Sequence, residues 1–144
     1  VALFIHLVLS GVPRTEITIL ASTQAQSDLV EEIVQKKTAW HKALGAPGAI
    51  SKVDDYRGKK NTVVILSLVR TDPTVAPLNE KQGIQAVSRA RSVLFVLGRC
   101  PSESYSWLHD LKPTNLHFSH KTIHSLEELQ ALNASLFQKL HPQQ

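Results

Sequence analysis

Hydrophobic residues gather in short runs that are separated by polar, periodic segments. Two of these runs, 62–69 and 92–98, are rich in β-branched residues and show no polar alternation, which is typical of strands buried on both faces of a parallel sheet. The run at 16–21 also has strand length. With shorter candidates at 49–53 and 115–119, the pattern predicts about five parallel strands.

The segments between these runs predict helices. One helix is expected to begin at Thr23, where Gln26 permits a capping box, and another to run from Asn79 to about Ala90. A third is expected over Ser125–Leu140, and the apolar opening at 1–13 predicts a buried helix too short to cross a bilayer. The apolar face of the helix after Thr23 is predicted to comprise Ala25, Leu29, Val30, Ile33 and Val34.

Alternating strands and helices predict an α/β fold, in which a parallel sheet is flanked by helices and joined by right-handed crossovers. Ligands of such sheets bind beyond the carboxyl ends of the strands. Three segments follow predicted strands and are candidates for this edge: Ser22–Gln26, Asp54–Lys60 and Arg70–Asp72.

Composition narrows the class of protein only slightly. The 144 residues suit one domain, and 42% hydrophobic with 19% charged residues indicate a globular chain. A net charge of +4 is compatible with a polyanionic partner without requiring one. Cys100 is the only cysteine, so no disulfide can form within the chain, which suits a reducing compartment. Because methionine is absent even at position 1, we expect the chain to begin inside a longer reading frame.

Three segments resemble motifs of superfamily 1B helicases. Residues 52–70, KVDDYRGKKNTVVILSLVR, resemble motif V, and residues 86–99, AVSRARSVLFVLGR, resemble motif VI. Residues 17–30 stand in the place of motif IV, and the order and spacing of the three agree with the family. The opening 1–13 and SLVRT at 67–71 are most similar to the Aquarius-like, intron-binding branch of these RNA helicases.

The resemblance implies that residues 1–100 form a second RecA-like lobe, of the P-loop NTPase type but without Walker A, and that 101–144 add a strand and a terminal helix packed on it. It implies RNA, the first RecA-like lobe of the same protein and spliceosomal proteins as partners, no membrane partner, and the nucleus as compartment. ATP and Mg²⁺ would be bound only together with the first lobe, since this chain has no Gly-rich phosphate loop.

The resemblance also assigns roles to individual residues. Arg89 would be an arginine finger for the γ-phosphate of ATP, although the helix dipole alone also favours a cation there. We expect it to be solvent-accessible, near the carboxyl edge and within reach of the Asp54–Lys60 turn. Gln26 is explained equally well by the nucleotide or RNA contact that the family makes and by a helix cap. Gly58 matches the glycine of motif V and also suits a tight turn that needs positive φ, and the two explanations are compatible. The implied nucleotide contacts are Gln26, Arg57, Gly58 and Lys60, and the implied RNA contacts are Lys59, Arg70 and Arg91.

Several positions depart from the family's motifs. Arg57 replaces the glutamine of motif V, Lys60 its acidic residue and Thr62 a following aspartate, while Thr23 replaces the aromatic residue of motif IV. Exchanging a neutral and an acidic group for two cations reverses the local charge. We therefore predict a lobe that has drifted from catalysis, with ATP hydrolysis weak or absent.

Two other readings of the function stay open. One is an active superfamily 1B helicase of RNA decay or processing, and the other is a non-catalytic lobe kept as a scaffold for protein contacts. No metal site is expected, because His117, His120 and His124 have no common zinc spacing. Trp40 and Trp107 could stack on bases, but are expected to be packing anchors.

Overall fold

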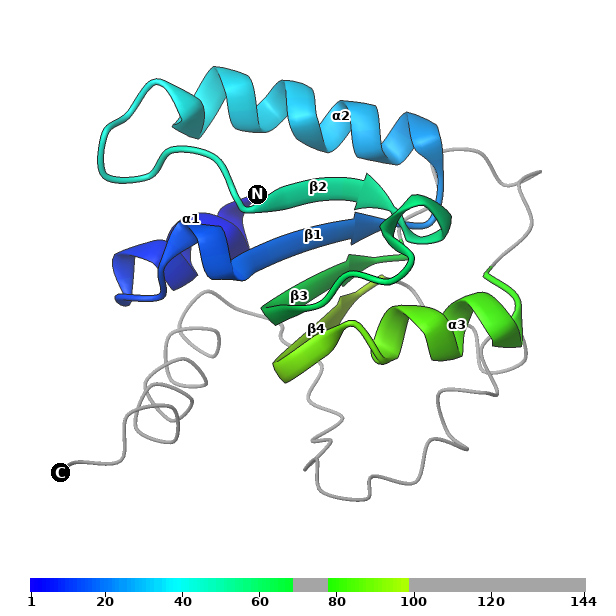
Figure 1. Cartoon of the computed structure of the whole chain (residues 1–144). Coiled ribbons are helices and arrows are strands. Elements are labelled where there is room, and N and C mark those ends of the chain that lie inside the picture. The colour runs from blue at the N-terminus through cyan, green and yellow to red at the C-terminus, as the bar shows by residue number, and fades with distance from the viewer. Residues whose placement is uncertain (69–77, 99–144) are drawn as a thin grey trace, which may run out of the picture. The chain divides into compact units, whose positions relative to one another are not determined.

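The computed structural model describes residues 1–68 and 78–98, which lie in the first of two compact units of the chain, Val1–Leu111 and Lys112–Gln144. The predicted strand at 115–119, the predicted helix Ser125–Leu140 and the whole 101–144 extension lie outside the described residues. The elements along the described chain (Figure 1) are α1 (Ala2–Leu9), η1 (Arg14–Glu16), β1 (Ile17–Ala21), α2 (Gln24–Val34), a π-helical turn η2 (Gln35–Ala39), β2 (Ala49–Lys52), η3 (Val53–Tyr56), β3 (Asn61–Ser67), α3 (Glu80–Val87) and β4 (Ala90–Leu97).

The described strands form one parallel sheet in the order β2-β1-β3-β4. The predicted α/β fold is therefore confirmed. All of β1 and the last five residues of β3 are buried, as their unbroken apolar runs predict for central strands. The strand predicted at 92–98 is present as β4, but the prediction that it is buried on both faces is wrong. This strand lies at an edge of the sheet formed by the described residues, and its side chains are half-buried or exposed.

Helices cover both faces of the sheet. Side chains alternate between the faces of a strand, and Leu20, Val64 and Leu66 share one core cluster with Ala86 of α3 and Tyr56 of η3. The next residue of β3, Ser67, points to the other face, where its hydroxyl accepts a hydrogen bond from Gln26 of α2. In Figure 1, α2 runs along the β2 side of the sheet and α3 along the β4 side.

The helix α2 is correctly predicted in position but not in face. Thr23 is its N-cap and accepts a hydrogen bond from the Gln26 backbone N–H. Val30 and Val34 are buried as predicted, but Ala25 and Leu29 are exposed. Their places on the buried face are taken by Gln26 and Ser27. Periodicity was misleading here because polar residues occupy the first buried turn, next to the carboxyl ends of the strands.

The predicted N-terminal helix is confirmed as α1, which buries Leu3, Phe4 and Leu7. Its end at Leu9 is exposed. Within the described residues, no helix is long and apolar enough to span a bilayer.

Candidate nucleic-acid and nucleotide interface

The loop that resembles motif V runs from the carboxyl edge of the sheet, where the strands end, to the amino-terminal edge, where the strands begin. It leaves the carboxyl end of β2 as the 3-10 turn Val53–Tyr56 and enters β3 at Asn61. Gly58 has φ 74°, which disfavours any residue with a side chain. A Cβ added there would meet nothing within 4 Å, so the space beside Gly58 is open. The turn explanation for Gly58 is confirmed, and the open space leaves room for a ligand.

The helix α3 holds this loop in place. Its N-cap Asn79 forms a complete capping box with Gln82. The Gln82 side chain also donates to both carboxylate oxygens of Asp54, at 3.2 and 3.0 Å. One turn further, Gln85 Nε2 donates to the carbonyl of Val53 at 3.2 Å. The motif V loop and the motif VI helix are thus joined through the side chains of two glutamines.

Arg89 follows α3 and binds the end of the loop that leads into β3. Its Nη1 donates to the Lys59 carbonyl at 3.2 Å, so the predicted reach to the Asp54–Lys60 turn is confirmed. Its Nε donates to the Gln85 carbonyl, and both Nε and Nη2 donate to Ser88 Oγ. A guanidinium carries five N–H donors. Within the described residues, one N–H on each terminal nitrogen is left for a further acceptor.

The expected position of Arg89 at the carboxyl edge is wrong. Its backbone carbonyl accepts from the Asn61 N–H, and Asn61 pairs with Ala90 where β3 and β4 begin. Arg89 therefore lies at the amino-terminal edge, half-buried and partly open to solvent. The motif VI helix ends before β4, so its last cation is placed where that strand starts. An arginine-finger role now requires the first lobe to face this amino-terminal edge.

Four cations come together at this edge, and we call them the edge cations: Lys59, Lys60, Arg89 and Arg91. The segments that carry them lie side by side, because Asn61 pairs with Ala90 and the Lys59 carbonyl binds Arg89. A β-bulge in β4 falls between its pairs with Asn61 and Val63, where Arg91 stands. Lys59, Lys60 and Arg91 are exposed, as is the neighbouring Arg57. Among the described residues, none of these cations has a carboxylate within 4.0 Å.

Gln26 lies at the opposite edge, so the predicted site residues do not form one cluster. It follows β1, and its side chain is only 8% exposed. Its Nε2 makes a long 3.4 Å bond to Ser67 Oγ at the carboxyl end of β3. Gln26 Oε1 and the Ser22 hydroxyl are buried and have no partner among the described residues. Buried polar atoms are normally bonded, so this edge also has unused capacity for a ligand.

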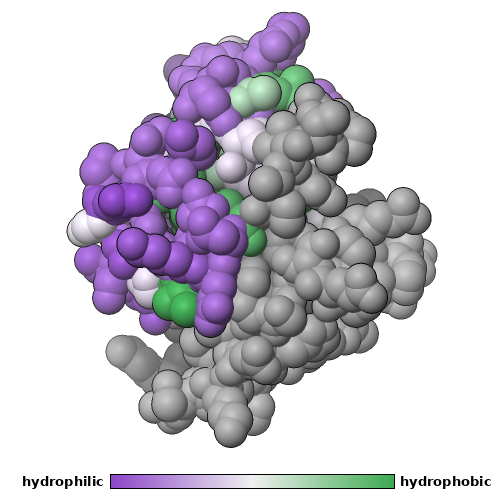
Figure 2. Space-filling model, turned by 90° about the vertical axis from the view of Figure 1, so that its right-hand side faces the viewer, coloured by the Kyte–Doolittle hydropathy of each residue, from purple (hydrophilic) through white to green (hydrophobic). Residues whose placement is uncertain are grey.

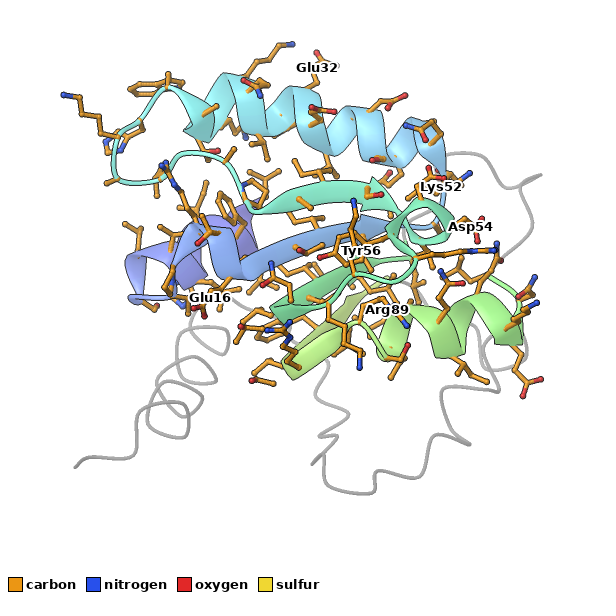
Figure 3. All side chains as sticks on the ribbon, in the orientation of Figure 1. Glu16, Glu32, Lys52, Asp54, Tyr56 and Arg89 are labelled. Carbon is orange, nitrogen blue, oxygen red and sulfur yellow. The ribbon has the colours of Figure 1, made fainter. Side chains whose placement is uncertain are left out.

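The carboxyl edge has a polar surface. Figure 2 views the molecule from the side on which β1 and β2 end, and most of the visible described surface there is hydrophilic. Lys52 and Asp54 lie at this end in Figure 3, whereas Tyr56 and Arg89 lie further back along the sheet.

Some of the predicted site residues lie outside the described part of the chain, and one contact of the site was not predicted. Arg70, Trp107 and the three clustered histidines lie outside the described residues. No group of three or more metal-binding side chains occurs within 1–68 and 78–98. The tie from Gln82 to Asp54 was missed, although the Asn-x-x-Gln spacing at Asn79 signals the capping box that positions Gln82.

Comparison with known proteins identifies the family. Residues 1–101 match the model of a family described as AAA domain. The chain is 32% identical over 99 residues to the RNA helicase aquarius of Mus musculus, which covers 69% of the chain and 7% of that protein. It is 34% identical over 97 residues to the helicase required for RNAi-mediated heterochromatin assembly 1 of Schizosaccharomyces pombe, covering 65% of the chain and 9% of that protein.

The match covers all the described elements, including the three segments that resemble helicase motifs. The parallel sheet flanked by helices is the architecture that the motifs imply. The chain spans less than a tenth of either relative's length. The chain therefore belongs to the AAA domain family, as an Aquarius-like RNA helicase domain of the superfamily 1 type.

Proposed function

We propose that this chain is the second RecA-like lobe of an Aquarius-like RNA helicase component of the spliceosome, acting in the nucleus. Its partners are RNA, the first lobe of the same protein and splicing proteins. The match to the AAA domain family and the relative named RNA helicase aquarius support this assignment. The second relative is named for RNAi-mediated heterochromatin assembly, which favours the alternative of an RNA-processing helicase in another pathway.

The observation that carries the RNA contact is the group of edge cations. Three of the four are exposed, and none has a carboxylate partner among the described residues. Arg89 is held in a fixed orientation with one N–H on each terminal nitrogen left over. Such donors match the phosphate oxygens of a nucleic-acid backbone. We assign Lys59 and Arg91 to phosphate contacts, together with Arg70 outside the described residues.

The nucleotide role requires the first lobe. ATP and Mg²⁺ are bound between the two lobes, with Arg57, Gly58 and Lys60 as contacts from this chain. Gln26 and Arg89 lie at opposite edges of the sheet, so Arg89 is not proposed as a finger for a nucleotide held at Gln26. Because Arg57 and Lys60 stand where the family has a glutamine and an acid, they hold phosphate by charge without positioning water. Hydrolysis by such a site is weak or absent.

A salt titration of RNA binding tests the phosphate contacts. We expect the full 144-residue chain to bind single-stranded RNA weakly, with an affinity that falls steeply as salt rises. In Lys59→Ala, the slope of log affinity against log salt should become shallower by about one unit, because one phosphate contact is lost. Fluorescence anisotropy of a labelled oligonucleotide measures both quantities.

The matched control is Lys81→Ala, which removes one exposed cation from α3, away from the edge cations. It should leave the slope unchanged. An equal loss of slope in Lys81→Ala would show that only net charge matters, and salt-independent binding would overturn phosphate contact altogether.

A further inference from the structure

An exposed tryptophan stands on the turn that follows α2. Trp40 is 72% exposed, so the expectation that it anchors packing is wrong. Its surroundings are charged rather than apolar, with the exposed residues Lys36, Lys37, His41 and Lys42 on either side. A protein-docking site is normally a contiguous apolar patch, and this is a single aromatic ring among cations.

The ring is fixed in place although it is exposed. Its Nε1 donates to the Lys36 carbonyl at 3.0 Å, and it makes an edge-to-face contact with the His41 ring, with centroids 5.5 Å apart. Fixing a side chain before binding removes part of the entropy cost of association. Trp40 therefore offers a prepared flat surface.

The backbone around the ring is also held. The buried Thr38 donates its hydroxyl to the Val34 carbonyl, and its own carbonyl accepts from the His41 N–H. His41 in turn accepts from Ala43 through Nδ1, and its carbonyl accepts from Leu44 and Gly45. The turn is widened by the π-helical segment Gln35–Ala39, a feature that often marks functional positions.

Charge complementarity favours one kind of occupant. Lys36 is paired with Glu32, but Lys37 and Lys42 have no carboxylate within 4.0 Å among the described residues. A flat π surface flanked by free ammonium groups matches a nucleobase flanked by its phosphates. We propose that Trp40, with Lys37 and Lys42, is a stacking site for single-stranded RNA, separate from the motif segments. The proposal rests on RNA as the partner of the proposed function and adds a second contact to it.

The position of this site differs from that of the edge cations. The turn leads into β2, which is the outer strand on one side of the described sheet. Arg89 and Arg91 flank the start of β4, which is the outer strand on the other side. In Figure 1 the turn after α2 lies on the far side of the sheet from α3. Loss of one contact can therefore be measured while the other is intact.

The test uses oligouridine RNA and the full chain carrying Trp107→Phe, so that Trp40 is its only tryptophan. RNA should quench the Trp40 fluorescence. In the chain with both tryptophans, Trp40→Ala should lower RNA affinity about 5- to 150-fold with little change in salt slope. Trp40→Phe should retain most of the affinity, and Leu29→Ala, which truncates another exposed apolar residue on the preceding helix α2, should retain all of it.

The outcomes separate this proposal from the proposed function. Quenching that persists in Lys59→Ala supports Trp40 as an independent contact. RNA binding that depends on the edge cations but is unaffected by Trp40→Ala overturns the stacking site alone. In the intact protein without RNA, a Trp40 shielded from acrylamide would show that another part of the polypeptide covers the ring, which also overturns it.

Discussion

A short chain of polar side chains connects the first strand with the motif V loop. The Thr18 hydroxyl, fully buried on β1, lies 3.1 Å from the Tyr56 hydroxyl and accepts from Asn61 Nδ2 at 2.9 Å. The same Asn61 amide donates to the Thr15 carbonyl. These bonds hold the end of the loop against the starts of β1 and β3, beside the edge cations.

Removing one hydroxyl from this chain should have a measurable cost. We expect Tyr56→Phe to lower the free energy of unfolding by about 0.5–1.5 kcal/mol, because the hydrogen bond is buried while the ring still packs. Urea denaturation measures the change. Tyr56→Leu is the comparison, and it should cost more because it also loses the ring from the core cluster. Equal stability of Tyr56→Phe and the unmodified chain would contradict the role of this bond.

At the scale of elements, the capped first turns of α2 and α3 each contact another element, α2 through Gln26 to β3 and α3 through Gln82 to the η3 turn. The α3 cap also positions Gln82, whose side chain binds both Asn79 and Asp54. On α2, the hydrogen bond from Lys36 lowers the pKa of Glu32. That contribution to stability is present above the unfolded-state pKa and is lost as pH falls through the lowered folded-state value. The pair is exposed, so salt weakens it.

The α3 cap can be tested by substitution. Asn79→Ala should destabilise the chain by about 1 kcal/mol, because the Gln82 N–H loses its acceptor. Asn79→Asp keeps an acceptor oxygen and should retain nearly all of the stability. Thermal unfolding followed by circular dichroism compares the three proteins. If Asp and Ala were equally destabilising, the cap would not be the cause.

At the scale of the whole molecule, the candidate residues form two groups at opposite edges of the sheet. Gln26 and Ser67 lie where strands end, and the edge cations lie where strands begin. Arg57 and Lys60, which stand where motif V of the family has a glutamine and an acidic residue, belong to the loop that connects these edges. The prediction of weak ATP hydrolysis rests on this charge reversal.

Full-length protein should bind ATP but turn it over slowly, even with RNA present. Two added cations stabilise bound ATP as much as the transition state of its hydrolysis. They therefore raise the affinity for ATP without raising the rate of hydrolysis. Steady-state phosphate release tests this, with the 144-residue chain alone as an inactive control. The double reversal Arg57→Gln/Lys60→Glu should raise the rate. RNA-stimulated hydrolysis at about 1 s⁻¹ or faster in the unmodified protein would contradict the prediction and support an active helicase.

The fold was more predictable than the site. The unbroken apolar runs located β1 and β3, and the cap residues Thr23 and Asn79 located the two helices. The sequence pattern already implied that Arg89 lies at the amino-terminal edge, because residue 89 directly precedes the predicted strand 92–98 of a parallel sheet. The expectation of the carboxyl edge came from the family role of Arg89 and was wrong. The sequence pattern missed the burial of Gln26, since a capped, polar first turn looks solvent-exposed.

The strand order also matters while the chain is being synthesised. The first strand, β1, is buried along its whole length, yet both of its neighbours in the sheet, β2 and β3, come later in the sequence. Its pairing from Ile17 to Val63 is long-range, and such contacts form slowly. β2 emerges before β3 and can pair with one edge of β1, but the other edge of this apolar strand is unpaired and open to other chains until β3 leaves the ribosome. We therefore expect the nascent domain to be most prone to association with other chains before residue 67 has emerged.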